Sequence, residues 1–65
     1  MTFNDIWMAL CEYPQKLCLI SEGICYDDKT AMDVFADRNA HKVVKKWKIK
    51  EASGFGYDLC VDLEE

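Results

Sequence analysis

The chain has 65 residues, of which 51% are apolar and 31% charged, and its formal net charge at pH 7 is −4. This length predicts a single domain, and the apolar content is too high for a disordered segment. So short a chain has little room for the deep pocket that enzyme sites usually need, so we expect a binding protein and not an enzyme.

The beginning of the chain does not pair a basic region with a following apolar run, and no apolar stretch approaches the length of a membrane span. We therefore expect neither a signal peptide nor a membrane association. The expected location is the cytoplasm of the producing cell, or of an infected host.

The four cysteines are Cys11, Cys18, Cys25 and Cys60. Their spacing contains no close pair such as C-x-x-C, which metal sites normally show. Each lies in an apolar segment, and we expect no export signal, so we predict reduced thiols that lie mostly in the core, with no metal and no cofactor. A metal site and a disulfide are the lesser alternatives.

Helical spacing of apolar residues predicts a first helix over about residues 3 to 12. Thr2 and Asp5 have the form of a capping box before it, and Pro14 stops it. Its expected apolar face consists of Phe3, Ile6, Trp7, Leu10 and Cys11.

Two short apolar runs follow, over residues 16–20 and 24–26, with Ser21-Glu22-Gly23 as turn material between them. They predict a hairpin, with one kinked strand as the alternative. Asp28 or Thr30 can cap a second helix, which we expect to end near Asn39. Its apolar stripe could also continue through Trp47, in which case residues 40–47 belong to the helix.

The last segment has the clearest pattern, because residues 47–50 and 57–64 both alternate between apolar and polar side chains. If Glu51 pairs with Tyr57, then Trp47 faces Val61 and Ile49 faces Leu59. The same register places Lys50 opposite Asp58 and Lys46 opposite Asp62. This agreement predicts a hairpin with Trp47 in the core.

Together these elements predict an α+β fold in the order helix, two strands, helix, two strands. We expect two amphipathic helices to cover one face of a small antiparallel sheet made of hairpins, in a two-layer arrangement.

Acidic residues gather at the start and outer face of the second predicted helix. Asp37 lies too far along this helix to serve its N-terminus, and it repels Asp33 four positions away. Phe55 stands between two glycines at the predicted hairpin tip, where it either folds back onto the sheet or is presented as a contact anchor. We predict partner contacts at Asp33, Asp37, Phe55 and, as a weaker candidate, Tyr26.

The basic segment from Lys42 to Lys50 is the alternative site. Lys46, Lys48 and Lys50, with Trp47 among them, could grip phosphates and stack a base. Two observations weaken this interpretation: Trp47 points away from the neighbouring lysines on a strand, and Asp58 and Asp62 face two of the lysines. The negative net charge also disfavours nucleic acid.

Catalytic patterns are weak, because His41 is the only histidine and the glycines near residue 55 lack the context of a phosphate-binding loop. We therefore expect a stand-alone interaction protein that binds a larger protein and inhibits or modulates it. By analogy of class alone, small inhibitors encoded by phages and other mobile elements look like this. The alternatives are a small nucleic-acid-binding regulator and a subunit that forms a homodimer through a sheet edge.

Overall fold

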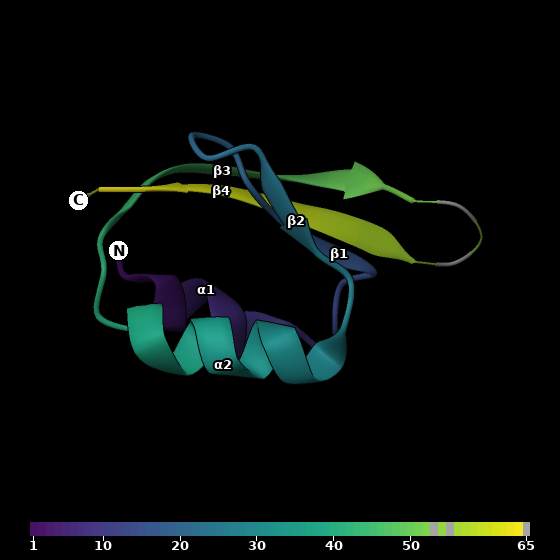
Figure 1. Ribbon diagram of the computed structural model, residues 1–65, viewed down its shortest axis with the longest axis horizontal. Coiled ribbons are helices and arrows are strands. Elements are labelled where there is room, and N and C mark those ends of the chain that lie inside the picture. The colour runs from purple at the N-terminus through teal and green to yellow at the C-terminus, as the bar shows by residue number, and fades with distance from the viewer. Residues whose placement is uncertain (53, 55, 65) are drawn as a thin grey trace.

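The computed structural model describes residues 1–52, 54 and 56–64. These residues form two helices and four strands, and both helices lie on the same side of the sheet (Figure 1). The predicted α+β class is confirmed. In chain order the elements are α1 Phe3–Ala9, β1 Lys16–Leu19, β2 Ile24–Tyr26, α2 Lys29–Asn39, β3 Val44–Glu51 and β4 Tyr57–Leu63. Within the described ranges, no helix combines the length and the apolar character that a membrane crossing requires.

The sheet has the strand order β2-β1-β4-β3. Each hairpin is antiparallel, as predicted, but β1 and β4 meet in the centre as parallel neighbours. The expectation of a purely antiparallel sheet was therefore wrong. Local patterns set the pairing within each hairpin, whereas the relative direction of the two hairpins depends on how α2 carries the chain from β2 to the far edge of the sheet.

The predicted register of the C-terminal hairpin is confirmed. Trp47 pairs with Val61, Ile49 with Leu59, and Glu51 with Tyr57. A register shift lies between Val44 and Lys46. Because α2 ends at Asn39 and β3 begins at Val44, the alternative of a longer second helix is excluded.

Side chains cap both helices at their start. The Asp5 carboxylate accepts a hydrogen bond from the backbone N–H of Thr2 at 2.9 Å, and Asp28 accepts one from the N–H of Ala31 at 3.0 Å. The end of α1 differs from the prediction, because the backbone is already extended at Leu10.

Residues 10–15 instead cross from α1 to β1, and Tyr57 holds them in place. The Tyr57 carbonyl accepts a hydrogen bond from the N–H of Gln15 at 2.7 Å, and its hydroxyl donates to the carbonyl of Glu12. Cys11 consequently lies beyond the helix and is exposed, so its expected place on the apolar helix face was wrong.

The core lies between the helices and the central strands. Its largest fully buried side chains are Phe3, Leu17, Met32, Leu59 and Val61. Aromatic rings run through it in a continuous series, with neighbouring centroids 5.4–5.7 Å apart. The series links the segment after α1 to β2 and consists of Tyr13, Trp7, Phe3, Phe35 and Tyr26.

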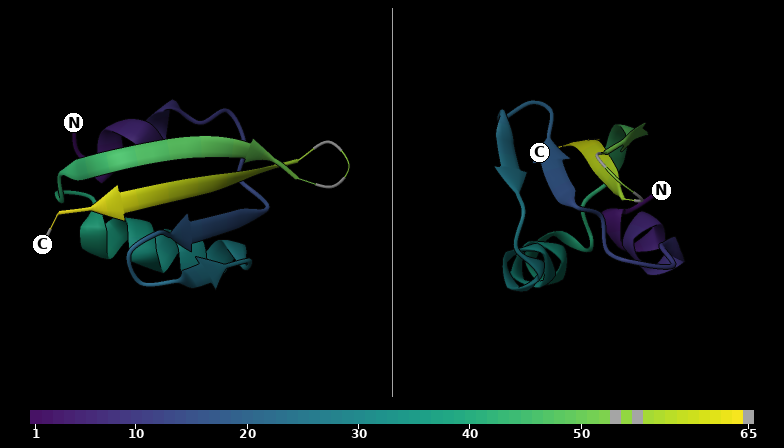
Figure 2. Two further views of the ribbon diagram at one scale, coloured as in Figure 1. Left: turned by 90° about the horizontal axis from the view of Figure 1, so that it is seen from above. Right: turned by 90° about the vertical axis from the view of Figure 1, so that its right-hand side faces the viewer.

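The helices do not cover the whole sheet: α1 lies on the side of β3 and β4, and α2 on the side of β1 and β2 (Figure 2). Trp47 pairs with the fully buried Val61, yet 45% of its surface is exposed. The prediction that Trp47 belongs to the core was therefore wrong. Its direction on the strand was read correctly, but the seven residues of α1 leave this edge partly uncovered.

All four cysteines are free thiols. Cys60 is buried and Cys18 half-buried, whereas Cys11 and Cys25 are exposed. The expectation of mostly buried cysteines thus fails for two of the four, because one follows the early end of α1 and the other lies on an edge strand.

Candidate interaction site

The outer edge of β3 is the longest strand edge in the sheet. At its beginning the N-terminal residues lie alongside it: Thr2 forms an antiparallel bridge with Val43, and the N–H of Val44 donates to the carbonyl of Met1 at 2.8 Å. From Lys45 onward, the described part of the chain places no strand on this side. The edge therefore offers unpaired backbone groups to an added strand.

An apolar groove of about 270 Å³ runs between this edge and α1. Trp47 and Ile49 form one wall, and they are 45% and 52% exposed. Residues of α1 and its flanks form the rest of the lining: Met1, Asp5, Ile6, Ala9 and Leu10. Contiguous exposed apolar side chains of this kind mark contact surfaces more often than isolated ones do.

The opposite face of β3 is basic. Lys46, Lys48 and Lys50 alternate with Trp47 and Ile49, so they point away from the helices, and all three are exposed. Their partners on β4 are more buried: Asp62 is 9% exposed, and one oxygen of Asp58, Oδ1, is buried without a hydrogen-bond partner. On this face of β3 the lysines are therefore more exposed than the carboxylates that lie opposite them.

The predicted acidic contact residues lie elsewhere. Asp33 and Asp37 are exposed on α2, on the side of the molecule that carries β2 (Figure 2). Asp33 accepts a hydrogen bond from the Tyr13 hydroxyl at 2.6 Å, an intramolecular partner that sequence reasoning missed. The structure does not bring these carboxylates to the edge of β3.

Tyr26, one of the two aromatic candidates, also lies away from this edge, on β2 at the other side of the sheet. Tyr26 is half-buried against Phe35, with 5.5 Å between the ring centroids. It lines a shallow depression of about 420 Å³ together with Val34 and Arg38. Phe55 lies outside the described residues.

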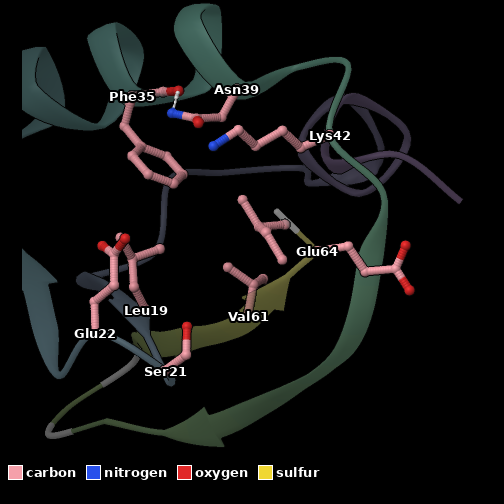
Figure 3. Close-up of a pocket in the computed structure, with 9 residues that line it drawn as sticks. Leu19, Ser21, Glu22, Phe35, Asn39, Lys42, Val61 and Glu64 are labelled. Carbon is pink, nitrogen blue, oxygen red and sulfur yellow. Dashed lines mark hydrogen bonds between the residues drawn. The ribbon is translucent and has the colours of Figure 1, made fainter.

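A small pocket lies between the end of α2, the turn after β1 and the end of β4 (Figure 3). Its volume is about 80 Å³, whereas sites for drug-sized ligands have about 300–1,000 Å³. The side-chain amide of Asn39 donates to the carbonyl of Phe35 at 2.9 Å, within its own helix (Figure 3). This pocket is therefore too small for a drug-sized ligand.

Sequence reasoning did not find the α1 side of the groove. Met1 and Ala9 are exposed, and only their position beside β3 makes them part of a surface. The available signal was the alternation of lysine with apolar residues in β3, which marks a strand with two different faces. Among the residues the structure describes, no cluster of three or more His, Cys, Asp or Glu side chains could hold a metal ion.

No family model, curated protein or solved structure matches this chain.

Proposed function

We propose that this chain is an interaction protein that binds an extended segment of a larger protein along the free edge of β3, and so inhibits or modulates that protein. One observation carries the proposal. Trp47 and Ile49 stand in register with the fully buried Val61 and Leu59, yet about half of each remains exposed beside a strand edge with which no described strand pairs. An added strand would cover these side chains and pair the backbone groups at the same time.

Strand β4 indicates the chemistry of such a partner, because it already pairs with the other edge of β3. Its apolar residues Leu59 and Val61 lie on the groove side, and its carboxylates Asp58 and Asp62 lie opposite lysines. A partner strand that alternates apolar and acidic residues would repeat this arrangement. Its apolar side chains would enter the groove beside α1, and its carboxylates would lie next to Lys46, Lys48 and Lys50.

The bridge at the beginning of β3 supports an antiparallel direction for the bound strand. Met1 and Thr2 already lie antiparallel to Val43 and Val44 on this edge. The edge therefore accepts an antiparallel neighbour without rearrangement, and an added antiparallel strand would continue the line that these two residues begin.

A second copy of the chain fits this edge poorly. Pairing β3 with the β3 of another copy would place two lysine-rich strands side by side, and like charges opposite each other are destabilising. Lysines on an edge strand are a common device against such self-pairing. The charge on this edge instead favours an acidic partner.

A peptide copying residues 57–63 with Cys60→Ser tests the proposal directly. In a Trp7→Phe background, we expect its titration to change the fluorescence of Trp47, the remaining tryptophan. The double change Lys46→Glu and Lys48→Glu should weaken binding at least tenfold, about 1.4 kcal/mol. A peptide with lysines in place of both aspartates should bind the charge-reversed protein more tightly than it binds the protein that keeps both lysines.

Two controls separate strand addition from simple charge attraction. A scrambled peptide of the same composition, and one with proline at its central position, should both fail to bind, because proline removes a backbone donor from the ladder. If both controls bind like the original peptide, the proposal is wrong. If a short single-stranded oligonucleotide binds instead, with an affinity that falls steeply with salt, the basic strand is a nucleic-acid site.

A further inference from the structure

The edge of the sheet opposite β3 contains a pair of thiols. Cys18 of β1 and Cys25 of β2 are register partners in the antiparallel hairpin, and their Sγ atoms lie 2.6 Å apart. Paired positions of antiparallel strands have Cα atoms about 4.5–5.5 Å apart, inside the range of about 4.4–6.8 Å that a disulfide spans. A small side-chain movement would therefore bring the two sulfurs to bonding distance.

The two thiols differ in access. Cys18 stands between the buried Leu17 and Leu19, so both cysteines point to the sheet face away from the helices. Cys25 is exposed on the edge strand, whereas Cys18 is half-buried on the neighbouring strand. A reagent in solution reaches Cys25 first.

Their reactivity differs for a related reason. Burial, followed by the hydrogen bond from Cys25, raises the pKa of the Cys18 thiol to about 12. Cys18 therefore keeps its proton at neutral pH and reacts slowly with a dissolved reagent, since the thiolate is the nucleophile. Its reaction depends on a sulfur held beside it, where the effective concentration is very high.

We propose that Cys18 and Cys25 form a dithiol site whose substrate is a low-molecular-weight disulfide, R–S–S–R, which converts the pair to an intramolecular disulfide between β1 and β2. The Cys25 thiolate attacks one sulfur of R–S–S–R, forms the mixed disulfide Cys25–S–S–R and releases R–S⁻. Cys18 then loses its proton to solvent and attacks the Cys25 sulfur, which breaks the mixed disulfide and releases a second R–S⁻. The two cysteines lose two protons and two electrons, which R–S–S–R takes up to become two R–SH.

Cys60 is the competing partner, because it lies beside Cys18 on β4 in the parallel register. It is only 6% exposed, so a dissolved disulfide does not reach it first. Cys11 serves as an internal comparison: it is exposed, but no other cysteine lies against it in the described structure.

The dithiol site does not depend on the binding proposed for β3, since β2 and β3 are opposite edges of the sheet.

The test uses reduced full-length protein freed of reductant and treated with glutathione disulfide, followed by acid quenching, alkylation and peptide mapping by mass spectrometry. We expect Cys25 to pass through a short-lived glutathione adduct and to end linked to Cys18, while Cys11 accumulates a stable adduct. Cys18→Ala should retain the adduct on Cys25, Cys25→Ala should leave Cys18 unmodified over the same time, and Cys60→Ala should react like wild type.

A second readout is the thermal unfolding midpoint. It should rise on oxidation and return with dithiothreitol, because the disulfide closes a loop between positions seven apart and so restricts the unfolded chain. A stable glutathione adduct on Cys25 in the wild type would overturn the proposal, and so would a link between Cys18 and Cys60. If Cys18→Ala fails to fold, Cys18→Ser provides the same trapping test.

Discussion

Tyr13 donates a hydrogen bond to Oδ1 of Asp33 at 2.6 Å, and this contact joins the segment after α1 to the first turns of α2. The Tyr13 ring also packs edge-on against Trp7, with 5.7 Å between centroids, and lies 5.5 Å from the ammonium group of Lys29. Asp33, which sequence reasoning offered to a partner, therefore helps to hold the two helices together.

This contact predicts that the free energy of unfolding depends on pH in the alkaline range. The hydrogen bond to Asp33 raises the pKa of Tyr13 above its ordinary value, so folding favours the protonated phenol. The stabilisation is complete below the unfolded pKa of about 10 and is lost as pH rises through the raised folded pKa. Urea unfolding from about pH 8 to about pH 12 should show wild type losing more stability than Tyr13→Phe. Equal losses would contradict a structural role for the contact.

Ile49 and Leu59 allow a matched comparison of the cost of truncating an exposed and a buried side chain, because they are register partners with opposite exposure. Leu59 is fully buried, so Leu59→Ala should lower the free energy of unfolding by about 2–5 kcal/mol. Ile49 is 52% exposed, so Ile49→Ala should cost about 1 kcal/mol or less. Trp47→Ala should likewise cost less than the roughly 3–5 kcal/mol of a fully buried aromatic. Equal costs at residues 49 and 59 in urea melts would show that β3 is covered in solution.

The Asp5 carboxylate predicts that the free energy of unfolding depends on pH in the acid range. The hydrogen bond from the Thr2 backbone lowers the pKa of the Asp5 carboxyl, so folding favours the ionised form. This stabilisation is present above the ordinary value of about 3.9 and is lost as pH falls through the lowered folded pKa. Asp5→Asn should therefore be less stable than wild type near neutral pH, and the difference should vanish in strong acid. Circular dichroism during urea unfolding measures it, and a constant difference down to about pH 2 would contradict it.

A substitution at Asp37 tests the acidic surface of α2, where the sequence predicted contact with a partner. It is exposed on α2, so Asp37→Lys should change the free energy of unfolding by less than about 0.5 kcal/mol. It should also leave binding of the acidic peptide to β3 within about twofold at physiological salt, where charges beyond about 8 Å are screened. If this change weakens capture of a natural partner tenfold while reversal of Lys46 and Lys48 does not, the partner docks on α2 and not on β3.

Much of the local structure could be read from the sequence, because separate signals agreed. In the C-terminal hairpin, one register satisfied both the apolar pairs and the charged pairs, and that register is the one observed. The first hairpin was predicted from its turn, where Gly23 has a φ of 68°, a conformation that other residues rarely adopt. The sequence offered Asp28 or Thr30 as the cap of α2, because either side chain can satisfy a free backbone donor, and Asp28 is the cap observed.

The candidate site required the tertiary structure. Alternation along β3 determined which way Trp47 points, but only the position of α1 decided that nothing in the described structure fully covers it. The parallel meeting of β1 and β4, the contact between Tyr13 and Asp33 and the pairing of Cys18 with Cys60 also join residues far apart in the chain. Side-chain periodicity specifies a face, which is a local property of the backbone, whereas burial of that face depends on which distant element packs against it.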